Sequence, residues 1–449
     1  MIKSNLPLAI IGLGKTGKSI AKYLNKINCD FIAYDTRKDL EITKEIKKEI
    51  HENKIILGEF KEEYIENHDN FIVSPGIKLE KNIIEKIKIS KKNIQTDIDI
   101  FNGKKRKNVI CITGTNGKTT VTLLIEHILK NLGKKVKAGA NVGLPVLELL
   151  SEDYEYNILE LSSFQLEMTK TINSKISLIT NITPDHLDRH ENFENYAILK
   201  NKIFNNAEIS IFNRLDNNIN SKATEERYTF GADVGQSLND FGIIKENNIN
   251  YISQGKKKII SENDVQLIGK HNFINICAAL AVIKALKLDV ELAAQTIKKF
   301  GCVEHRMENF LKNDNISWIN DSKSTNIDST ISAIKSLDKN IVLLMGGRSK
   351  TNDYSELEKV LKNKVDKIIF FGESKNFLKN ALKSVKDISI ANNMEHAVCE
   401  AINFINIKKE NCEENMYIIL SPACSSYDMY KSFEERGKSF KNHAINQYK

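Results

Sequence analysis

The stretch VICITGTNGKTTVTLLIEHIL, residues 109–129, decides the fold of the central part of the chain. An apolar, β-branched run ends in a glycine-rich turn, and Lys118, Thr119 and Thr120 then open an amphipathic helix. The N–H groups of such a turn and the positive end of the helix face an anion, to which a lysine adds charge and a hydroxyl can add a Mg²⁺ ligand. The stretch therefore predicts a phosphate-binding unit. It departs from the standard P-loop, because Ile112 stands where the first glycine is required.

Composition limits the class of protein. A chain of 449 residues with 41% hydrophobic and 28% charged residues is typical of two or three globular domains. The net charge of +8 is spread along the whole chain, and without RNP-like aromatic signatures or zinc-finger spacing it argues against nucleic-acid binding. Seven cysteines without a C-x-x-C pair indicate a reduced compartment, and no signal peptide or membrane-length apolar run is visible. We expect a cytoplasmic protein without membrane insertion that acts as a monomer.

Domain boundaries are indicated by two breaks in an otherwise regular β-α-β pattern. Short apolar runs alternate with lysine-rich amphipathic stretches, which predicts an α/β fold with parallel sheets. The basic segment 101–108 and the segment 298–310 interrupt this pattern. We predict three domains: 1–103, 104–301 and 302–449. Residues 205–265 are polar and weakly alternating, and we expect an antiparallel or irregular flank of the central domain there.

Polar motifs repeatedly follow apolar strands. In open α/β sheets ligands bind outside the carboxyl ends of the strands, so these junctions predict one large composite site between domains. The polar segments are GLGKTGKS, DTR, SPGI, TGTNGKTT, ELSSFQ, NITPDH, DSKSTN, GGRSK and SPACSS.

The first of these junctions carries G-x-G-x-x-G at Gly12, Gly14 and Gly17, followed by a strand that ends in Asp35. A dinucleotide-binding domain shows this pattern, with the acid on a ribose hydroxyl, but a tight turn without any ligand shows it too. Asp35-Thr36-Arg37 could equally bind a base or sugar, and the arginine favours a phosphate-bearing ligand.

Other junctions have both a functional and a purely structural interpretation. Glu160 ends a strand beside the predicted phosphate site and can hold Mg²⁺, although a solvent-exposed acid is common at such a position. Asp185 and His186 begin a charged segment that could be a helix cap, and histidine is an unusual Mg²⁺ ligand. Arg306 and Asp321 could reach phosphate and ribose or form an interdomain ion pair. Cys424 has no histidine nearby to activate it, so we expect it to pack.

Together these motifs resemble the ATP-dependent Mur ligases, three-domain enzymes that build the peptidoglycan stem peptide. GTNGKTT, NITPDHLDRH, HRME and NDSKSTN look like the motifs shared by that family, in which the isoleucine variant of the cradle is usual. The motifs GLGKTGKS, DTR, SPGI, ELSSFQLE, GGRSK and LSPACSSYDMYKSFEERGKSF match more specifically the member that adds D-glutamate. The resemblance implies a Rossmann-like N-terminal domain, a central P-loop-type ATPase domain and a Rossmann-like C-terminal domain.

The resemblance also implies the chemistry. ATP would phosphorylate the terminal carboxylate of UDP-N-acetylmuramoyl-L-alanine (UDP-MurNAc-L-Ala), and the amine of D-glutamate would attack the acyl phosphate. By resemblance the ATP-binding residues are Gly114, Thr115, Asn116, Gly117, Lys118, Thr119, Thr120, Asn272, Arg306 and Asp321. Those for the UDP substrate are Gly14, Lys15, Thr16, Asp35, Thr36, Arg37, Ser74, Asn141 and Gly143, and those for D-glutamate are Lys323, Thr325, Lys350, Ser426 and Phe433.

The implied metal ligands are Thr119, Glu160 and His186, serving two Mg²⁺ ions, together with Lys200. In the family the lysine at this position is carbamylated by CO₂, which turns a cation into an anionic oxygen ligand. Lys202 lies close enough to leave the alignment open, and Tyr196 favours Lys200. Lys118, Glu160, His186 and Lys200 are thus the expected catalytic residues.

Three alternatives remain at this level. Another Mur-type or folate-glutamate ligase would share the central motifs but not the GLGKTGKS and DTR motifs in front of them. A nicotinamide dehydrogenase would explain the first domain and leave GTNGKTT without a role. A non-catalytic nucleotide-binding module would not need the acids of the metal site.

Overall fold

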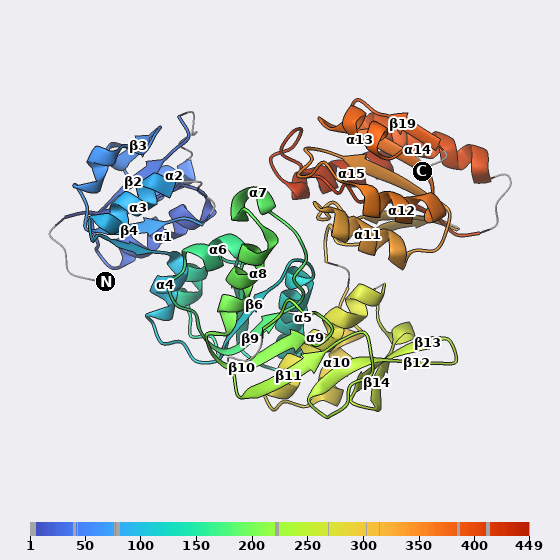
Figure 1. Ribbon diagram of the computed structural model, residues 1–449, viewed down its shortest axis with the longest axis horizontal. Helices are drawn as coiled ribbons and strands as arrows, with labels where there is room; N and C mark the ends of the chain where they lie inside the picture. Colours follow the sequence, from blue (N-terminus) through green and yellow to red (C-terminus); the bar gives the residue numbers. More distant parts are fainter. Residues whose placement is uncertain are drawn as a thin grey trace.

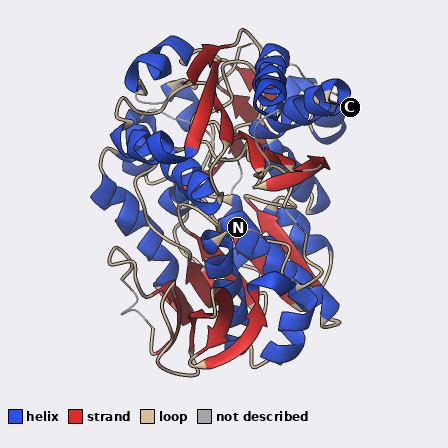
Figure 2. Cartoon of the chain, turned by 90° about the vertical axis from the view of Figure 1, so that its right-hand side faces the viewer, coloured by secondary structure: helices blue, strands red, loops and turns tan. Residues whose placement is uncertain are grey.

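A computed structural model describes residues 6–38, 42, 44–75, 77, 81–220, 224–267, 269–301, 303–313, 315–383, 387–409 and 414–448. Gly76 of the SPGI motif and the side chain of Asp188 lie outside the described part of the chain. Three sheets follow one another along the sequence, each in its own body, with the first and third bodies above the second in Figure 1. Figure 2 shows strands of the sheets lying between helices. The predicted three-domain α/β fold is confirmed.

The first sheet is parallel throughout and has the order β3-β2-β1-β4-β5. Its apolar strands are short, and the turn after β1 leads directly into α1, as the glycine motif requires. A Cβ at Gly17 would lie 1.7 Å from the carbonyl oxygen of Gly12, so the helix can approach the strand only with glycine there. The elements are β1 (Leu8–Ile11), α1 (Lys15–Lys26), β2 (Phe31–Asp35), α2 (Lys44–Glu49), β3 (Ile55–Leu57), β4 (Asn70–Val73), α3 (Lys81–Ile89), β5 (Asn93–Gln95) and α4 (Asp97–Asn102).

The second sheet has nine strands in the order β14-β13-β12-β11-β10-β9-β6-β8-β7. Strand β6, between β9 and β8, is fully buried, and α5 and the apolar helix α9 cover the sheet. The elements are β6 (Val109–Thr113), α5 (Lys118–Asn131), β7 (Val136–Ala140), the 3₁₀ turn η3 (Val146–Ser151), β8 (Tyr156–Glu160), α6 (Ser163–Met168), β9 (Asn173–Ile179), α7 (Leu187–His190), α8 (Phe193–Asn201), β10 (Asn206–Asn213), β11 (Glu226–Phe230), β12 (Asp240–Glu246), β13 (Ile249–Gln254), β14 (Lys257–Ser261), α9 (Lys270–Ala285) and α10 (Val290–Ile297).

The expectation for residues 205–265 was only partly right. Strands β12, β13 and β14 do form an antiparallel meander. Strands β10, β11 and β12, however, continue the parallel sheet from β9. The alternation is weak because both faces of β10 are covered: Ile209 and Ile211 pack in the core beneath α9, while Phe212 on the other face packs against the core cluster of the first and second domains. This segment therefore enlarges the central sheet.

The third sheet has the order β15-β16-β20-β17-β18-β19, parallel except for the edge strand β15. Strand β15 begins at Glu308, inside the segment that the sequence marks as a domain break. The elements are β15 (Glu308–Asn313), β16 (Ile316–Asn320), α11 (Ile327–Ser336), β17 (Ile341–Gly346), α12 (Ser355–Lys364), β18 (Val365–Phe371), α13 (Lys375–Ala381), β19 (Asp387–Ile390), α14 (Met394–Lys409), β20 (Met416–Leu420) and α15 (Phe433–Gln447). Within the described residues, no helix has the length and apolar character needed to cross a membrane.

A buried arginine fixes the loops of this third domain. The Arg436 guanidinium, fully buried on α15, donates to the carbonyl oxygens of Ser322 (2.9 Å), Cys424 (3.1 Å) and Gly346 (3.3 Å). Each of these carbonyls belongs to the end of a strand or to the loop that follows it. One side chain thus ties together the loops after β16, β17 and β20.

We predict that Arg436→Met destabilises the third domain by about 3 kcal/mol, because it leaves buried carbonyl oxygens unpaired. Trp318, the single tryptophan, lies fully buried in β16 and reports unfolding of this domain by fluorescence in urea. The exposed neighbour Lys438 offers the control, Lys438→Met. An unchanged unfolding midpoint for Arg436→Met would contradict this role of the guanidinium.

Candidate active site

The predicted phosphate cradle forms between β6 and α5, and two of its residues must be glycine. Gly114 has φ 143° and Gly117 has φ 84°, conformations that L side chains rarely adopt. A Cβ at Gly114 would lie 1.9 Å from Thr180 Oγ1, and one at Gly117 would lie 2.4 Å from Asn275 Oδ1. Lys118 Nζ donates to the carbonyl oxygens of Gly114 and Thr115, both at 2.7 Å. The positive charge is therefore held over the turn whose N–H groups form the cradle.

A second lysine reaches the same turn from α8. Lys200 is 1% exposed, and its Nζ donates to the carbonyl oxygen of Gly114 at 2.8 Å and lies 4.6 Å from the ring centroid of Tyr196. Burial, with the neighbouring charge of Lys118, lowers the pKa of Lys200 well below its ordinary value. Lys202 points elsewhere and donates to the carbonyl oxygens of Leu166 and Thr169.

An acid with an unsatisfied oxygen faces these two lysines. Glu160, at the end of β8, is 1% exposed, and its Oε1 accepts from Asn141 Nδ2 at 2.6 Å. Its Oε2 is buried without a hydrogen-bond partner among the described residues. Thr119 contributes a buried hydroxyl at the start of α5. A buried carboxylate oxygen without a donor, together with a hydroxyl, is a donor set that suits a hard cation such as Mg²⁺.

The third domain contacts the second domain at this same edge. Arg306 Nη2 donates to Thr119 Oγ1 at 2.6 Å, and Ser329 Oγ donates to Asn116 Oδ1 at 2.6 Å. Asp185 accepts from Asn326 Nδ2 at 3.1 Å. These three contacts bring α11 and the segment before β15 against the phosphate cradle.

Asp185 is the acid on which this contact centres. Besides Asn326, it has Lys350 Nζ at 3.8 Å and His186 Nε2 at 3.7 Å. Burial alone would raise the pKa of Asp185, but Lys350 and His186 outweigh it and the pKa is lowered. Its Oδ1 also accepts from the N–H of His186, but His186 is the N-cap residue of α7 and, among the described residues, no side chain caps that helix, so the capping role considered for Asp185 from sequence is wrong. Its bonds to Asn326 and Lys350 of the third domain were not predicted.

Two buried groups of the third domain complete this edge. Lys323 Nζ lies 3.7 Å from the ring centroid of Phe433, and burial together with Arg306 lowers the pKa of Lys323 to about 7. Asp321 accepts from Ser421 Oγ at 2.8 Å, and burial raises the pKa of Asp321 to about 6. Both groups can therefore change protonation near neutral pH.

These residues line one cavity of about 1090 Å³ between the second and third domains. Of the predicted residues, it includes Thr115, Asn116, Gly117, Lys118, Thr120, Asn141, Glu160, His186, Lys200, Asn272, Arg306, Asp321, Lys323, Thr325, Lys350, Ser426 and Phe433. Thr119 lines an adjoining cavity of about 530 Å³. Gly114 is not among the lining residues, but its carbonyl oxygen accepts from Lys118 and Lys200, which line the larger cavity. The larger cavity is also lined by His271, Asn326 and Ser329, which were not predicted. They reach the cavity only because the second and third domains meet there.

Except for Asn141, which lines this cavity, the residues predicted for the UDP substrate lie apart from it. None of the described residues of the first domain lines the cavity above. Asp35 is buried, and its carboxylate accepts from the N–H of Leu13 at 2.8 Å and from Arg37 Nε and Nη2, both at 2.8 Å. The remaining members are Gly14, Lys15 and Thr16 at the start of α1, Thr36 beside Asp35, Ser74 after β4, and Gly143 in the turn after β7.

Comparison with known proteins agrees with this architecture. Three family models match in order: "Mur ligase MurD-like, N-terminal domain" at residues 7–96, "Mur ligase middle domain" at 112–283 and "Mur ligase, glutamate ligase domain" at 305–424. A UDP-N-acetylmuramoylalanine–D-glutamate ligase of Legionella pneumophila is 35% identical over 441 residues, covering 96% of this chain and 97% of its own. The chain belongs to the Mur ligase family.

Solved structures of Mur ligases share the fold. The UDP-N-acetylmuramate-alanine ligase MurC of Thermotoga maritima matches with a TM-score of 0.62 at 18% identity, covering 98% of this chain and 100% of its own. The MurF ligase of the same organism, solved in complex with ADP, matches with a TM-score of 0.58 at 13% identity, covering 99% and 96%. At these identities the likeness concerns the fold of the Mur ligase alone.

Asp321 gives this Mur ligase a predictable pH dependence. Because its pKa is higher in the folded chain than in the unfolded chain, the folded state binds more protons between about pH 4 and pH 6. Its contribution to stability is therefore greatest in acid and falls as the pH rises through this window, by at most about 1.4 kcal/mol per pH unit. Asp321→Asn should remove this fall from the free energy of unfolding.

Denaturant midpoints measured from pH 4 to pH 7 test this slope. Asp338→Asn, at an exposed acid of the same domain, is the control and should keep the wild-type slope. If Asp321→Asn also kept it, the raised pKa of Asp321 would be refuted.

Proposed function

We propose that this chain is a UDP-N-acetylmuramoylalanine–D-glutamate ligase of peptidoglycan precursor synthesis. It uses ATP to phosphorylate the terminal carboxylate of UDP-MurNAc-L-Ala, and the amine of D-glutamate displaces phosphate from the acyl phosphate to form the amide. The observation that carries this proposal is the single cavity in which the cradle of the second domain faces Lys323, Lys350 and Phe433 of the third. Relatives that align over almost the whole chain bear this enzyme name.

Activation by ATP explains the charge distribution of the site. A carboxylate is a poor electrophile, so phosphorylation must come first. In the proposed site the triphosphate lies on the N–H groups of the cradle, where Lys118 and Arg306 neutralise charge that develops during transfer. Asn272 and Asp321 hold the nucleoside. The second domain (104–301) thus binds ATP, and the third (302–449) supplies D-glutamate and part of the ATP contacts.

The residues beside the cradle fit a bound Mg²⁺. The ion would be held by Glu160 Oε2, which lacks a donor, by the Thr119 hydroxyl and by His186. When bound, the metal would neutralise charge at the phosphates. Arg306 now donates to Thr119 Oγ1, so we propose that its guanidinium turns to the phosphates when the metal binds.

We also propose that Lys200 is carbamylated. CO₂ reacts with a neutral amine, and burial beside Lys118 favours that form of Lys200. The resulting carbamate would offer anionic oxygens next to a cradle that otherwise carries two lysines, Lys118 and the buried Lys200. Lys202 is bonded to backbone carbonyls outside the cavity and does not fit this role.

The first domain (1–103) binds the UDP substrate in this proposal. A dehydrogenase would need Asp35 as acceptor for a ribose hydroxyl, but both of its carboxylate oxygens already accept from Leu13 and Arg37. Thr36 and the exposed side of Arg37 remain for the uracil, and Gly14, Lys15, Thr16, Ser74, Asn141 and Gly143 surround the diphosphate and sugar. The enzyme needs no second copy for this arrangement, and we propose a monomer.

Phosphate release with UDP-MurNAc-L-Ala and a panel of amino acids tests the proposed substrate. D-Glutamate should support turnover, whereas L-glutamate, L-alanine, L-lysine and diaminopimelate should not. Lys350→Ala should raise the apparent KM for D-glutamate roughly ten- to a hundredfold, because one charge-assisted bond to a carboxylate is lost, while the KM for ATP changes little. Lys362→Ala, at an exposed lysine of the same domain, is the control. Preference for another amino acid would refute this function and leave the family membership intact.

Lys200 has its own test. Lys200→Ala should lower kcat by at least about a hundredfold, and formate or acetate should restore part of it by supplying the missing anion. With ¹³CO₂, the wild-type protein and Lys202→Ala should show a carbamate carbon signal in NMR that Lys200→Ala lacks. Full activity of Lys200→Ala without additive, or a signal that disappears in Lys202→Ala instead, would contradict the assignment.

A further inference from the structure

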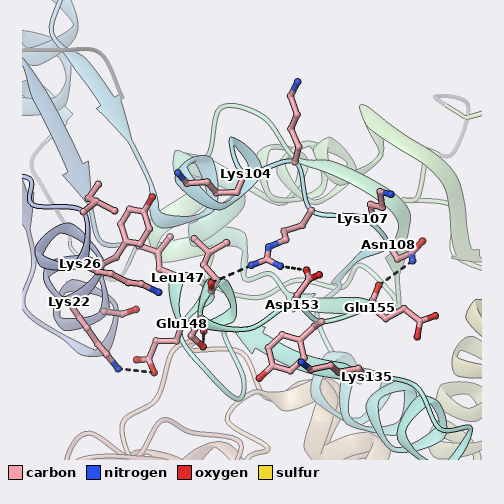
Figure 3. A pocket seen from close by; sticks show the side chains of 18 residues that line it. Lys22, Lys26, Lys104, Lys107, Asn108, Lys135, Leu147, Glu148, Asp153 and Glu155 are labelled. Atoms are coloured by element: carbon pink, nitrogen blue, oxygen red, sulfur yellow. Dashed lines mark hydrogen bonds and ion pairs between the residues drawn. The ribbon is translucent and has the colours of Figure 1, made fainter.

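A second large cavity, of about 1080 Å³, lies at the amino ends of strands β6, β7 and β8, whereas the active-site cavity lies at the carboxyl ends of the strands of this sheet (Figure 3). The residues around it precede strands, in contrast to those of the active site: Lys107 and Asn108 precede β6, Lys135 precedes β7, and Glu155 precedes β8. The other wall is the C-terminal half of α1, and the basic hinge 104–107 runs between the two walls. The cavity is therefore built by both domains and is distinct from the active site.

The lining has more positive than negative charge. It contains seven basic residues, Lys22, Lys26, Lys104, Lys105, Arg106, Lys107 and Lys135, against three acids, Glu148, Asp153 and Glu155. Arg106 is paired with Asp153 at 2.7 Å. Lys22 is paired with Glu148 at 3.7 Å (Figure 3). Lys26, Lys105 and Lys107 form no ion pair with any described residue, so the cavity has positive charge to spare.

Two buried hydroxyl groups of α1 add an independent observation. Ser19 and Tyr23 are 4% and 8% exposed, and neither Ser19 Oγ nor Tyr23 OH has a hydrogen-bond partner among the described residues. Both residues line the cavity, on the same face of α1 as Lys22 and Lys26. A buried hydroxyl without a partner is costly, and an acceptor atom of a ligand would satisfy it.

The cavity also has apolar surface suited to a ring. Tyr23, Ile27, Leu147, Leu150 and Tyr154 line it between the lysines. Lys104 Nζ lies 5.8 Å from the ring centroid of Tyr23, and Lys135 Nζ lies 5.7 Å from that of Tyr154. Charged nitrogens alternating with aromatic and aliphatic side chains match a ligand that combines a planar ring with anionic groups.

We propose that this hinge cavity, between α1 and the amino ends of β6, β7 and β8, binds a small aromatic phosphate. The phosphate lies among Lys26, Lys104 and the hydroxyls of Ser19 and Tyr23, and the ring lies against Leu147 and Tyr154. Because the walls belong to two domains, such a ligand binds best when these domains are arranged as in Figure 1, and its binding favours that arrangement.

Titration of the full chain with fluorescent 1-naphthyl phosphate tests the proposal, with ADP and Mg²⁺ present in excess to fill the phosphate cradle. The wild-type protein should bind one equivalent. The double variant Lys26→Ala/Lys104→Ala should bind about tenfold or more weakly. The double variant Lys312→Ala/Lys339→Ala, at exposed lysines of the third domain, should bind as the wild type does. Absence of saturable binding, or equal binding by both double variants, would overturn the proposal.

Two further measurements separate the hydroxyl and the ring from charge alone. Tyr23→Phe should weaken binding of the probe severalfold, yet without the probe its melting temperature should not fall, because the hydroxyl it removes is unpaired. Inorganic phosphate should bind much more weakly than the naphthyl compound. Unchanged affinity in Tyr23→Phe, or equal affinity for the two phosphates, would contradict the proposed binding mode.

Discussion

Two lysine ammonium groups, those of the buried Lys200 and the half-buried Lys118, meet at one carbonyl oxygen, and the rest of the site depends on this juxtaposition. Lys118 and Lys200 both donate to Gly114, one from the helix that follows the turn and one from α8. Charges of like sign at this depth are costly unless an anion joins them or one of them is neutral. A phosphate bound on the cradle would supply the anion, and a carbamate on Lys200 would replace one of the two positive charges with a negative one. The backbone conformation at Gly114 and Gly117 holds both lysines in place.

The third domain also contributes charged side chains to the cavity beside the cradle. It contributes Arg306, Lys323 and Lys350, which would add to the positive charge, but Asp185 and Glu160 interact favourably with these cations and with Lys118. The balance is close, so the protonation of Asp321 and Lys323 is set by burial at values near neutral pH. Such a site is suited to polyanionic substrates, and polar bonds made by Arg306, Asn326 and Ser329 join the second and third domains beside it.

Much of the fold and the site could be predicted from sequence because parallel strands end at one edge of a sheet. The cradle, Glu160 and Asp321 were placed in this way, and the structure brings them into one cavity. The bonds of Asp185 to Asn326 and Lys350 could not be predicted, since they depend on how two domains are placed, which no local pattern encodes. Lys200 required the family resemblance, because a helix lysine is ordinarily exposed. The parallel strands β10 and β11 were missed because β10 carries apolar side chains on both faces, Ile211 on one and Phe212 on the other, which removes the alternation.

The central claim is that the turn between β6 and α5 is where the transferred phosphate is bound, while the first domain holds the UDP substrate independently. Calorimetric titration of Lys118→Ala with ATP and with UDP-MurNAc-L-Ala, beside the wild type, tests this most directly. The account predicts that ATP binding weakens by about tenfold or more and ligation is abolished, while the dissociation constant of the UDP substrate changes little. Wild-type ATP affinity and turnover in Lys118→Ala would contradict it.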